Sequence, residues 1–583
     1  MRPVVLGLLL GGVGTGLGAQ QPGPALPGAV LEANVAVPMR DGVILRADVW
    51  RPAGAGPFPV LVYRTPYGKD GVLRTFGLYR KAVERGYAVV TQDVRGRYAS
   101  DGVFLPYQQE GKDGYDTIEW AAAQPWSNGR VGTVGLSYPG AVQWLAAVES
   151  PPSLKAMVPA MTFASARHFW YSGNVWDASW IPWIWNNIAP DLRKRSGIAG
   201  PRTGEEGRAT WAEQGRPLQD VRPLAAMSAF KGLADWYYAW MSHSADDPWW
   251  DWADLTKKYG RTSAAVLNLS AWHDEAYGPS GATENYLGLV GDRGPGPRTR
   301  LLMGPWIHGV SPMVRSVTGH REMGPEAVFD YDETVLRWMD RWVREIDNGV
   351  DREPPVRVFV MGQNQWRTAT AWPIPEARNR SWYLSGVGQL SGDTLGSATA
   401  STSFVSDPGY PVRDRWAEQS GAHDYRSLVG REDVLTFETE PLAADLTVIG
   451  AIEAEVFLST DAPDTDLWVK VFDVAPDGTA WNLMSPGLDV IRASYRDGGV
   501  ERKLLEPGSI YRLRLPNLLT SNQFKAGHRI RIAVMTSFAP HMSHNLHTGE
   551  LEFTSSVGRT ARVTIHHGPG ARSRIILPVV PNR

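Results

Sequence analysis

Cysteine is absent from the 583 residues of this chain. Its absence excludes disulfide bonds, thiol catalysis and thiolate metal sites, so stability has to come from packing. A net charge of either sign is nearly absent too, because 59 lysines and arginines stand against 61 aspartates and glutamates. No bulk electric field would hold such a chain on nucleic acid or on an anionic membrane, and we expect neither as a partner.

Long apolar runs are lacking except at the amino terminus. There a charged start precedes an apolar run from Val4 to Leu17 that contains five glycines, and small residues follow near Ala19. These features are typical of a secretory signal peptide, whereas a run this short and glycine-rich is a poor membrane anchor. We therefore expect residues 1–19 to be removed and the mature protein to be secreted or periplasmic, with no membrane association.

The rest of the chain is long enough for several domains. Its 43% apolar and 21% charged residues are ordinary for a folded protein. Between residues 30 and 160, short β-branched runs at 60–63 and 88–91 alternate with helical patterns such as 116–122. This alternation predicts βαβ units around a largely parallel sheet.

Residues 161–262 interrupt this pattern. They are rich in tryptophan and contain few strand signals, so we expect a helical cap inserted into the sheet domain. Strand-like runs return at 265–269 and 300–303, and apolar side chains at helical spacing predict a long helix over 332–345. The second part of the sheet domain is therefore expected over 263–372.

A proline-rich break at 372–375 separates the last part of the chain, residues 375–583. Short alternating segments such as 453–458 and 529–534 are divided there by glycine, aspartate and proline turns. This pattern predicts a β-sandwich or jelly roll.

The strongest local signal is Gly-Leu-Ser-Tyr-Pro-Gly at 135–140, which follows a β-rich stretch and precedes a helical one. A strand, a turn of small residues and a helix form the setting of a nucleophile elbow, in which the serine sits on a strained turn. The helix N-terminus beside Ser137 would also favour the negative charge that develops in acyl transfer. Taken alone, the motif also fits a serine that caps a helix after a glycine-rich turn.

Two further residues favour catalysis. Asp274 follows the strand-like run 265–269 and His308 follows 300–303, so both side chains would project from the carboxyl ends of strands. The chain order Ser, Asp, His is that of α/β-hydrolases and differs from the orders in chymotrypsin and subtilisin folds. We therefore predict an α/β-hydrolase domain with an inserted helical cap, followed by a C-terminal jelly roll, and a catalytic triad of Ser137, Asp274 and His308.

Each of these residues also has an ordinary explanation. Asp274 fits a turn at a strand end, and a single histidine in a Gly-Pro loop is more often structural than catalytic. His273 and Glu275 adjoin the predicted acid and are easily mistaken for the acid or the base. We expect both to contact the catalytic groups rather than to act themselves.

Three histidines of the last part, His541, His544 and His547, lie close together in the sequence. No nearby carboxylate or cysteine completes a metal site, so we expect a surface loop, no metal and no cofactor.

The elbow is one of several motifs that are spread over nearly the whole mature chain. The others are Arg-Thr-Pro-Tyr at 64–67, Asp-Val-Arg-Gly-Arg at 93–97, Ser-Asp-Gly at 100–102, Gln-Pro-Trp-Ser-Asn-Gly-Arg-Val-Gly at 124–132, Gly-Pro-Trp at 304–306, Asp-Thr-Asp-Leu-Trp-Val-Lys at 464–470, Gly-His-Arg at 527–529 and Asn-Leu-His-Thr-Gly at 545–549. In this order they resemble the cocaine esterase and X-prolyl dipeptidyl peptidase family of α/β-hydrolases, which includes glutaryl acylases and α-amino acid ester hydrolases.

The resemblance implies Ser137 as nucleophile, His308 as general base and then acid, and Asp274 as the group that orients the imidazole. It also implies an oxyanion hole made by the backbone N–H of Tyr138 and the hydroxyl of Tyr67.

Relatives that act on a free α-amino group hold it with carboxylates after the catalytic aspartate and in the first cap segment. In this chain those positions are Ala276, Tyr277 and the segment 166–170, which reads Ala-Arg-His-Phe-Trp. We therefore expect a substrate that is neutral or acidic near the scissile bond, with a neutral or aromatic acyl group preferred. The residues expected to line its pocket are Trp170, Trp176, His168 and Tyr277. For any single tryptophan, packing between cap helices is the simpler explanation.

Two alternatives stay open. The same triad serves an amidase, either an acylase or an X-prolyl exopeptidase, which must protonate a poorer leaving group. The chain could instead be a secreted binding protein with an inactive hydrolase part, although a protein without catalysis has no need to keep Ser137, Asp274, His308 and Tyr67 together. The expected partner is a small-molecule ester or amide, and the sequence leaves a homo-oligomer open.

Overall fold

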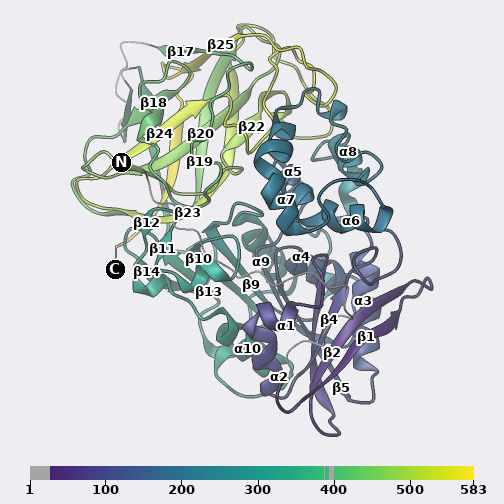
Figure 1. Ribbon diagram of the computed structural model, residues 1–583. Helices are drawn as coiled ribbons and strands as arrows, with labels where there is room; N and C mark the ends of the chain where they lie inside the picture. Colours follow the sequence, from purple (N-terminus) through teal and green to yellow (C-terminus); the bar gives the residue numbers. More distant parts are fainter. Residues whose placement is uncertain (1–25, 387, 393–399, 583) are drawn as a thin grey trace, which may run out of the picture.

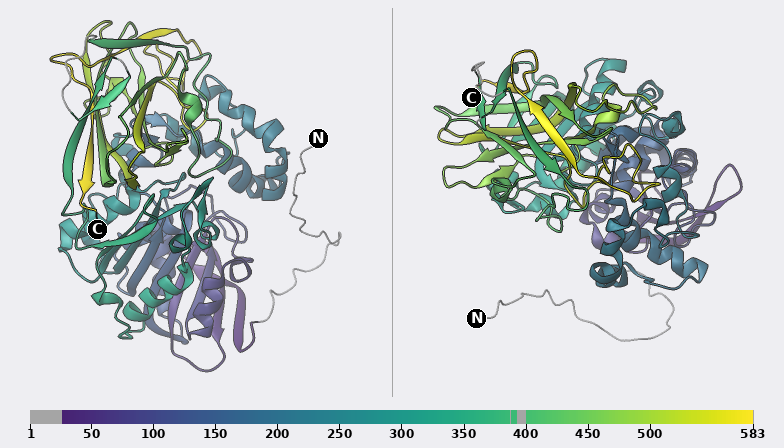
Figure 2. Two further views of the ribbon diagram at one scale, coloured as in Figure 1. Left: turned by 90° about the vertical axis from the view of Figure 1, so that its left-hand side faces the viewer. Right: turned by 90° about the horizontal axis from the view of Figure 1, so that it is seen from above.

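The chain folds into an α/β part and a β part, with a set of helices against both. The computed structural model describes residues 26–386, 388–392 and 400–582, so the predicted signal peptide at 1–19 lies outside the described residues. The purple and teal α/β part lies at one end of the molecule and the green to yellow β part at the other (Figure 1). The blue helices lie beside the junction of the two parts, as the turned views also show (Figure 2).

A ten-stranded sheet forms the centre of the α/β part. In spatial order its strands are β1 (Ala29–Pro38), β2 (Ile44–Pro52), β4 (Ala88–Asp93), β3 (Phe58–Thr65), β5 (Ser127–Leu136), β6 (Leu154–Ala160), β9 (Ala265–His273), β10 (Thr299–Ile307), β13 (Val356–Val360) and β14 (Gln365–Ala369). The seven strands from β4 to β13 are parallel, and antiparallel strands lie at both edges. Parallel strands end at the same edge of a sheet, which gathers the loops that follow β5, β9 and β10.

Helices cover both faces of this sheet, as burial on both sides requires. Val60 and Val62 of β3 pack on the face of α3 and α4, whereas Leu61 and Tyr63 pack on the face of α2 and α10. The helices of this part are α1 (Val72–Thr75), α2 (Gly77–Glu84), α3 (Glu110–Ala122), α4 (Tyr138–Ala147), α9 (Ser280–Arg293) and α10 (Tyr331–Trp342). None of the helices among the described residues is long and apolar enough to cross a bilayer.

The segment between β6 and β9 is built from short helices, because prolines, glycines and bulky aromatic residues interrupt longer ones. Its main elements are β7 (Tyr171–Ser172), β8 (Val175–Trp176), α5 (Trp180–Trp183), a π-helical turn (Ile184–Ile188), α6 (Ala189–Ser196), α7 (Gly204–Thr210) and α8 (Trp236–Met241). Most of its tryptophans are buried against one another and against the sheet domain. We call this segment the cap.

The C-terminal part is a β domain whose apolar residues pack mainly in two clusters, one on each side of β20. Its strands are β15 (Arg378–Ser385), β16 (Gln389–Ser391), β17 (Ser401–Ser406), β18 (Leu435–Glu438), β19 (Leu446–Thr460), β20 (Asp466–Val474), β21 (Ala480–Asn482), β22 (Val490–Arg492), β23 (Tyr511–Phe524), β24 (Arg529–Met535), β25 (Ala561–His566) and β26 (Arg574–Val580). The predicted fold class, an α/β-hydrolase domain followed by a β domain, is confirmed.

The predicted surface loop at His541–His547 is wrong, because the β domain and the cap bury this segment between them. The His541 carbonyl accepts the N–H of Ala178 at 2.9 Å, and the N–H of Ser543 donates to Trp176 at 2.9 Å. His547 is 1% exposed, and its Nε2 lies 2.8 Å from the hydroxyl of Ser406. The loop joins two domains, which its sequence alone does not reveal.

Arg492 is expected to contribute strongly to the stability of the β domain. Its guanidinium is buried and contacts the Asp466 carboxylate at 2.8 and 3.1 Å and that of Glu552 at 2.9 Å. Arg492→Met leaves both carboxylates buried without their cation, so we expect a loss of about 3–5 kcal/mol in the free energy of unfolding, measured by urea denaturation.

The control is Arg514→Met, which removes an exposed ion pair with Glu453 from the same domain. Exposed pairs contribute about 0–1 kcal/mol. Equal losses in the two variants would contradict the role given to Arg492.

Candidate active site

Ser137 lies on a sharp turn between β5 and α4. Its backbone has φ 71° and ψ −132°, a strained conformation for a residue with a side chain. A Cβ at position 135 would lie 2.6 Å from Pro139, and a Cβ at position 140 would lie 2.5 Å from the carbonyl of Ala160. Both positions therefore require glycine, and together they present Ser137 at the sheet edge.

The side chain of Tyr138 anchors this turn. Its hydroxyl donates to the Glu110 carboxylate at 2.8 Å and accepts the N–H of Tyr107 at 3.0 Å. Glu110 in turn forms a buried ion pair with Arg64 at 2.9 Å. Because Tyr138 is the first residue of α4, its own N–H has no acceptor within the helix and is free for an incoming oxygen.

Asp274 and His308 meet at the ends of the neighbouring strands β9 and β10. His308 Nδ1 lies 2.8 Å from Asp274 Oδ1. The Asp274 side chain is buried, and it also accepts the backbone N–H groups of Ala276 at 3.1 Å and Tyr277 at 3.3 Å. These two N–H groups hold the Asp274 carboxylate in place, and the carboxylate in turn orients the imidazole of His308.

Glu275 is a second carboxylate beside His308. Its Oε2 accepts the backbone N–H of His308 at 3.1 Å. Burial lowers the pKa of His308, but Asp274 and then Glu275 act against burial, so the net pKa lies above the ordinary value. Burial raises the pKa of Glu275 itself. Both carboxylates thus favour the imidazolium form.

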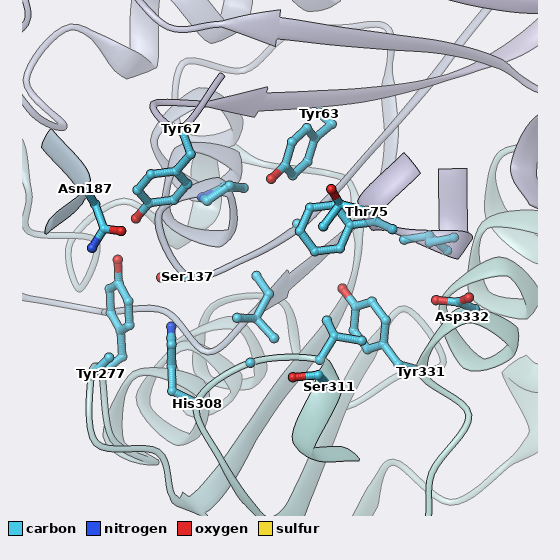
Figure 3. Close-up of a pocket in the computed structure, with 18 of the residues that line it drawn as sticks. Tyr63, Tyr67, Thr75, Ser137, Asn187, Tyr277, His308, Ser311, Tyr331 and Asp332 are labelled. Atoms are coloured by element: carbon cyan, nitrogen blue, oxygen red, sulfur yellow. The ribbon is translucent and has the colours of Figure 1, made fainter. Parts of the chain in front are cut away.

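Four of the predicted site residues, Ser137, His308, Tyr67 and Tyr277, lie around one region in Figure 3. One ring nitrogen of His308 points toward Ser137, and the hydroxyls of Tyr67 and Tyr277 point to the same place. Because Nδ1 is bound to Asp274, the nitrogen that faces Ser137 is Nε2. The Tyr67 hydroxyl also accepts the indole N–H of Trp183 at 3.0 Å.

Burial raises the pKa of the Tyr67 phenol, although hydrogen bonds from Trp183 and Ser137 act in the opposite direction. Tyr67 therefore stays protonated at neutral pH and keeps a hydrogen to donate. Tyr277 has the same protonation, since burial raises its pKa well above the ordinary value, and its hydroxyl lies 3.0 Å from that of Tyr107.

A cavity of about 1000 Å³ opens at these residues. Ser137, His308, Tyr67, Tyr277 and Glu275 line it, whereas Asp274, which contacts His308 Nδ1, does not. On the side of the cap its walls are Phe169, Trp180, Trp183 and Asn187.

Three of the four residues predicted to line the pocket do not line this cavity. Trp170 and Trp176 are 0% and 3% exposed and belong to the core of the cap, and His168 Nε2 contacts the Glu284 carboxylate at 2.8 Å. Only Tyr277 lies where it was predicted. The only sequence signal that Trp180 and Trp183 line the cavity was the high tryptophan content of the cap. Composition does not say which of these rings face the cavity and which pack in the core.

The two neighbours of Asp274, His273 and Glu275, make different contacts. Glu275 holds the backbone of His308, which agrees with the expected supporting contact. His273 is fully buried, and burial lowers its pKa to about 3, so its ring is neutral. The backbone carbonyl of His273 accepts the hydroxyl of Ser485 at 2.9 Å, a contact with the β domain.

Comparison with known proteins gives concordant matches. The profile of the X-Pro dipeptidyl-peptidase (S15) family matches residues 41–310, and that of the X-Pro dipeptidyl-peptidase C-terminal non-catalytic domain matches residues 348–576. A cocaine esterase from Rhodococcus sp. (strain MB1 Bresler) is 34% identical over 94% of this chain and 98% of its own length.

Two solved structures superpose on nearly the whole chain. An α-amino acid ester hydrolase superposes with a TM-score of 0.82 at 26% identity and covers 95% of this chain and 97% of its own. An aminopeptidase from the marine sediment archaeon Thaumarchaeota archaeon has a TM-score of 0.83 at 23% identity, over 97% of this chain and 99% of its own, and so shares the fold.

Removal of the charge on Glu275 should lower the pKa of His308, because Glu275 helps to raise it. The predicted base works only when neutral, so kcat/KM for an ester rises as the pH increases through this pKa. We expect the rising limb of the pH profile to shift to lower pH in Glu275→Gln. Glu275→Ala also removes the acceptor of the His308 N–H, worth about 1 kcal/mol, and should lower kcat by a further factor of about five.

The matched control is Glu284→Gln, which removes a carboxylate from another histidine–carboxylate pair, at His168. Its profile should stay in place. A Glu275→Gln profile that coincides with that of the unchanged protein would refute the coupling.

Proposed function

The chain belongs to the cocaine esterase and X-Pro dipeptidyl-peptidase family of serine hydrolases, and on this basis we propose that it cleaves a carboxylic ester through an acyl-enzyme on Ser137. The observation that carries the proposal is the 2.8 Å contact between His308 Nδ1 and Asp274, which leaves Nε2 directed at Ser137. That arrangement is what an alcohol needs to become a nucleophile at neutral pH.

The proposed reaction assigns one role to each of these groups. His308 Nε2 takes the proton of Ser137 as its oxygen attacks the ester carbonyl, and Asp274 stabilises the resulting imidazolium. The negative oxygen of the tetrahedral intermediate accepts the N–H of Tyr138 and the hydroxyl of Tyr67. His308 then returns the proton to the departing alcohol, and a water molecule repeats the sequence to release the acid.

The acyl group is proposed to be neutral or aromatic. Phe169, Trp180 and Trp183 form the cap side of the cavity, and Ala276 occupies a position where relatives that bind an ammonium group carry a carboxylate. Asp177 is the carboxylate on the cap side, and it accepts the N–H of Ser179 at 2.7 Å, while burial raises its pKa to about 6. At neutral pH this carboxyl is still largely ionised, and the N–H of Ser179 satisfies part of its charge.

Tyr67→Phe should lower kcat by a factor on the order of 10²–10³, because one of two donors to the oxyanion is lost. Ser137→Ala should abolish turnover and labelling by a fluorophosphonate without a change in melting temperature. Tyr410→Phe is the control, since Tyr410 is 81% exposed and does not line the cavity. An undiminished rate in Tyr67→Phe would remove that tyrosine from the oxyanion hole.

Esters should be better substrates than amides, and uncharged acyl groups better than α-amino acyl groups. Hydrolysis of a p-nitrophenyl ester is compared with that of an X-Pro anilide, and a phenylacetyl ester with the matching phenylglycyl ester. Faster cleavage of the anilide would favour an exopeptidase, and a preference for the phenylglycyl ester would contradict the acyl proposal. A lack of fluorophosphonate labelling would favour an inactive binding protein.

Export through the signal peptide at residues 1–19 remains a proposal. The amino-terminal sequence of the protein isolated from its natural host tests it, and cleavage near Ala19 is the expected result.

A further inference from the structure

The cavity extends beyond the predicted catalytic groups into a second arm, on the side away from the cap. We call it the distal arm and define it by six lining residues: Tyr63, Phe76, Tyr79, Val310, Phe329 and Tyr331. In Figure 3, Tyr63 and Tyr331 lie on the opposite side of Ser137 and His308 from Tyr67 and Tyr277. The arm therefore starts at the reacting atoms and leads away from the cap.

The walls of the distal arm are aromatic and belong to the sheet domain. The rings of Tyr63 and Tyr79 have centroids 4.9 Å apart, and Phe76 lies 6.2 Å from each. Burial raises the pKa of Tyr63, Tyr79 and Tyr331, so all three phenols are neutral. Such walls bind a flat apolar group better than a charged one.

The outer end of the distal arm is different. Val314 and Val328 line the cavity there and are 63% and 51% exposed, and Lys81 and Asp332 form an ion pair of 2.9 Å among the lining residues. A ligand that fills the arm thus meets apolar walls inside and a wet, polar rim outside. The arm admits a group that continues into solvent.

The side of the ester that enters this arm follows from the direction of proton transfer. His308 must return its proton to the departing oxygen, so the alcohol part lies on the side of the histidine. Ser311, three residues after His308, lies on the side of the distal arm in Figure 3, whereas Tyr67 and Asn187 of the cap lie on the other side. The acyl group then faces the cap and the alcohol faces the distal arm.

We propose that the distal arm is the binding site for the alcohol part of the substrate and selects esters of bulky, aryl-bearing alcohols. This inference rests on the proposed ester hydrolysis at Ser137. The volume of about 1000 Å³ lies at the upper end of ligand pockets, about 300–1000 Å³, which leaves room for both halves of such an ester.

The test compares ethyl benzoate with 2-(2-naphthyl)ethyl benzoate, which have similar leaving groups and form the same benzoyl-enzyme. The unchanged protein should prefer the naphthyl ester by about tenfold or more in kcat/KM, as expected when apolar surface is buried in a fitted pocket. Phe76→Ala, which removes a wall, and Val328→Trp, which narrows the rim, should each reduce this preference by about fivefold or more. The rate of deacylation should not change, because the alcohol has already left when the benzoyl-enzyme is hydrolysed.

The control variant is Val557→Trp, which adds the same ring at an exposed valine of the β domain, and it should keep the full preference. Absence of a preference in the unchanged protein overturns the inference, and so does a change of deacylation rate in Val328→Trp, since that would place the acyl group in the arm. Hydrolysis of neither ester, together with no fluorophosphonate labelling, would instead refute the proposed function and this inference with it.

Discussion

The hydrogen bond between His308 Nδ1 and the carboxylate of Asp274 is the interaction on which the whole site depends. It joins the loops after two neighbouring parallel strands, β9 and β10, so the sheet fixes the distance between the groups. Asp274 is 1% exposed, and in a medium of low dielectric constant the attraction is strong. Without it a carboxylate would stay buried with no cation nearby and the imidazole would be free to turn away from Ser137.

The β domain supports this pair although the described residues that line the cavity all come from the α/β part and the cap. Ser485 holds the backbone of His273, one residue before the acid. Gly421 and Gly319 let a loop of the β domain approach the segment after His308, since a Cβ at either position would lie 2.6 or 2.5 Å from backbone atoms of the other loop. The β domain contributes no described residue to the cavity lining, and these contacts limit the movement of the proposed catalytic groups.

One buried cation, Arg97, holds the loop that carries Tyr67, the proposed oxyanion donor. Arg97 is 0% exposed, and its guanidinium donates to the carbonyls of Pro66 at 2.9 Å, Ile188 at 2.8 Å and Asn187 at 3.1 Å. It thus ties the loop that carries Tyr67 to the cap that carries Trp183. This explains physically why an arginine-rich motif at 93–97 accompanies the elbow motif in the sequence.

The sequence by itself determined the parallel sheet, the elbow at Ser137, the strand-end positions of Asp274 and His308 and the β domain, because these follow from local periodicity, turn chemistry and chain order. Only the tertiary structure decided that Trp183 lines the cavity whereas Trp170 is buried in the core. It also decided that the loop with His547 is buried and that the Glu275 carboxylate accepts the backbone N–H of His308. It also revealed the distal arm. These features arise where segments far apart in the chain pack together, and burial of a side chain there depends on its neighbours rather than on its own residue type.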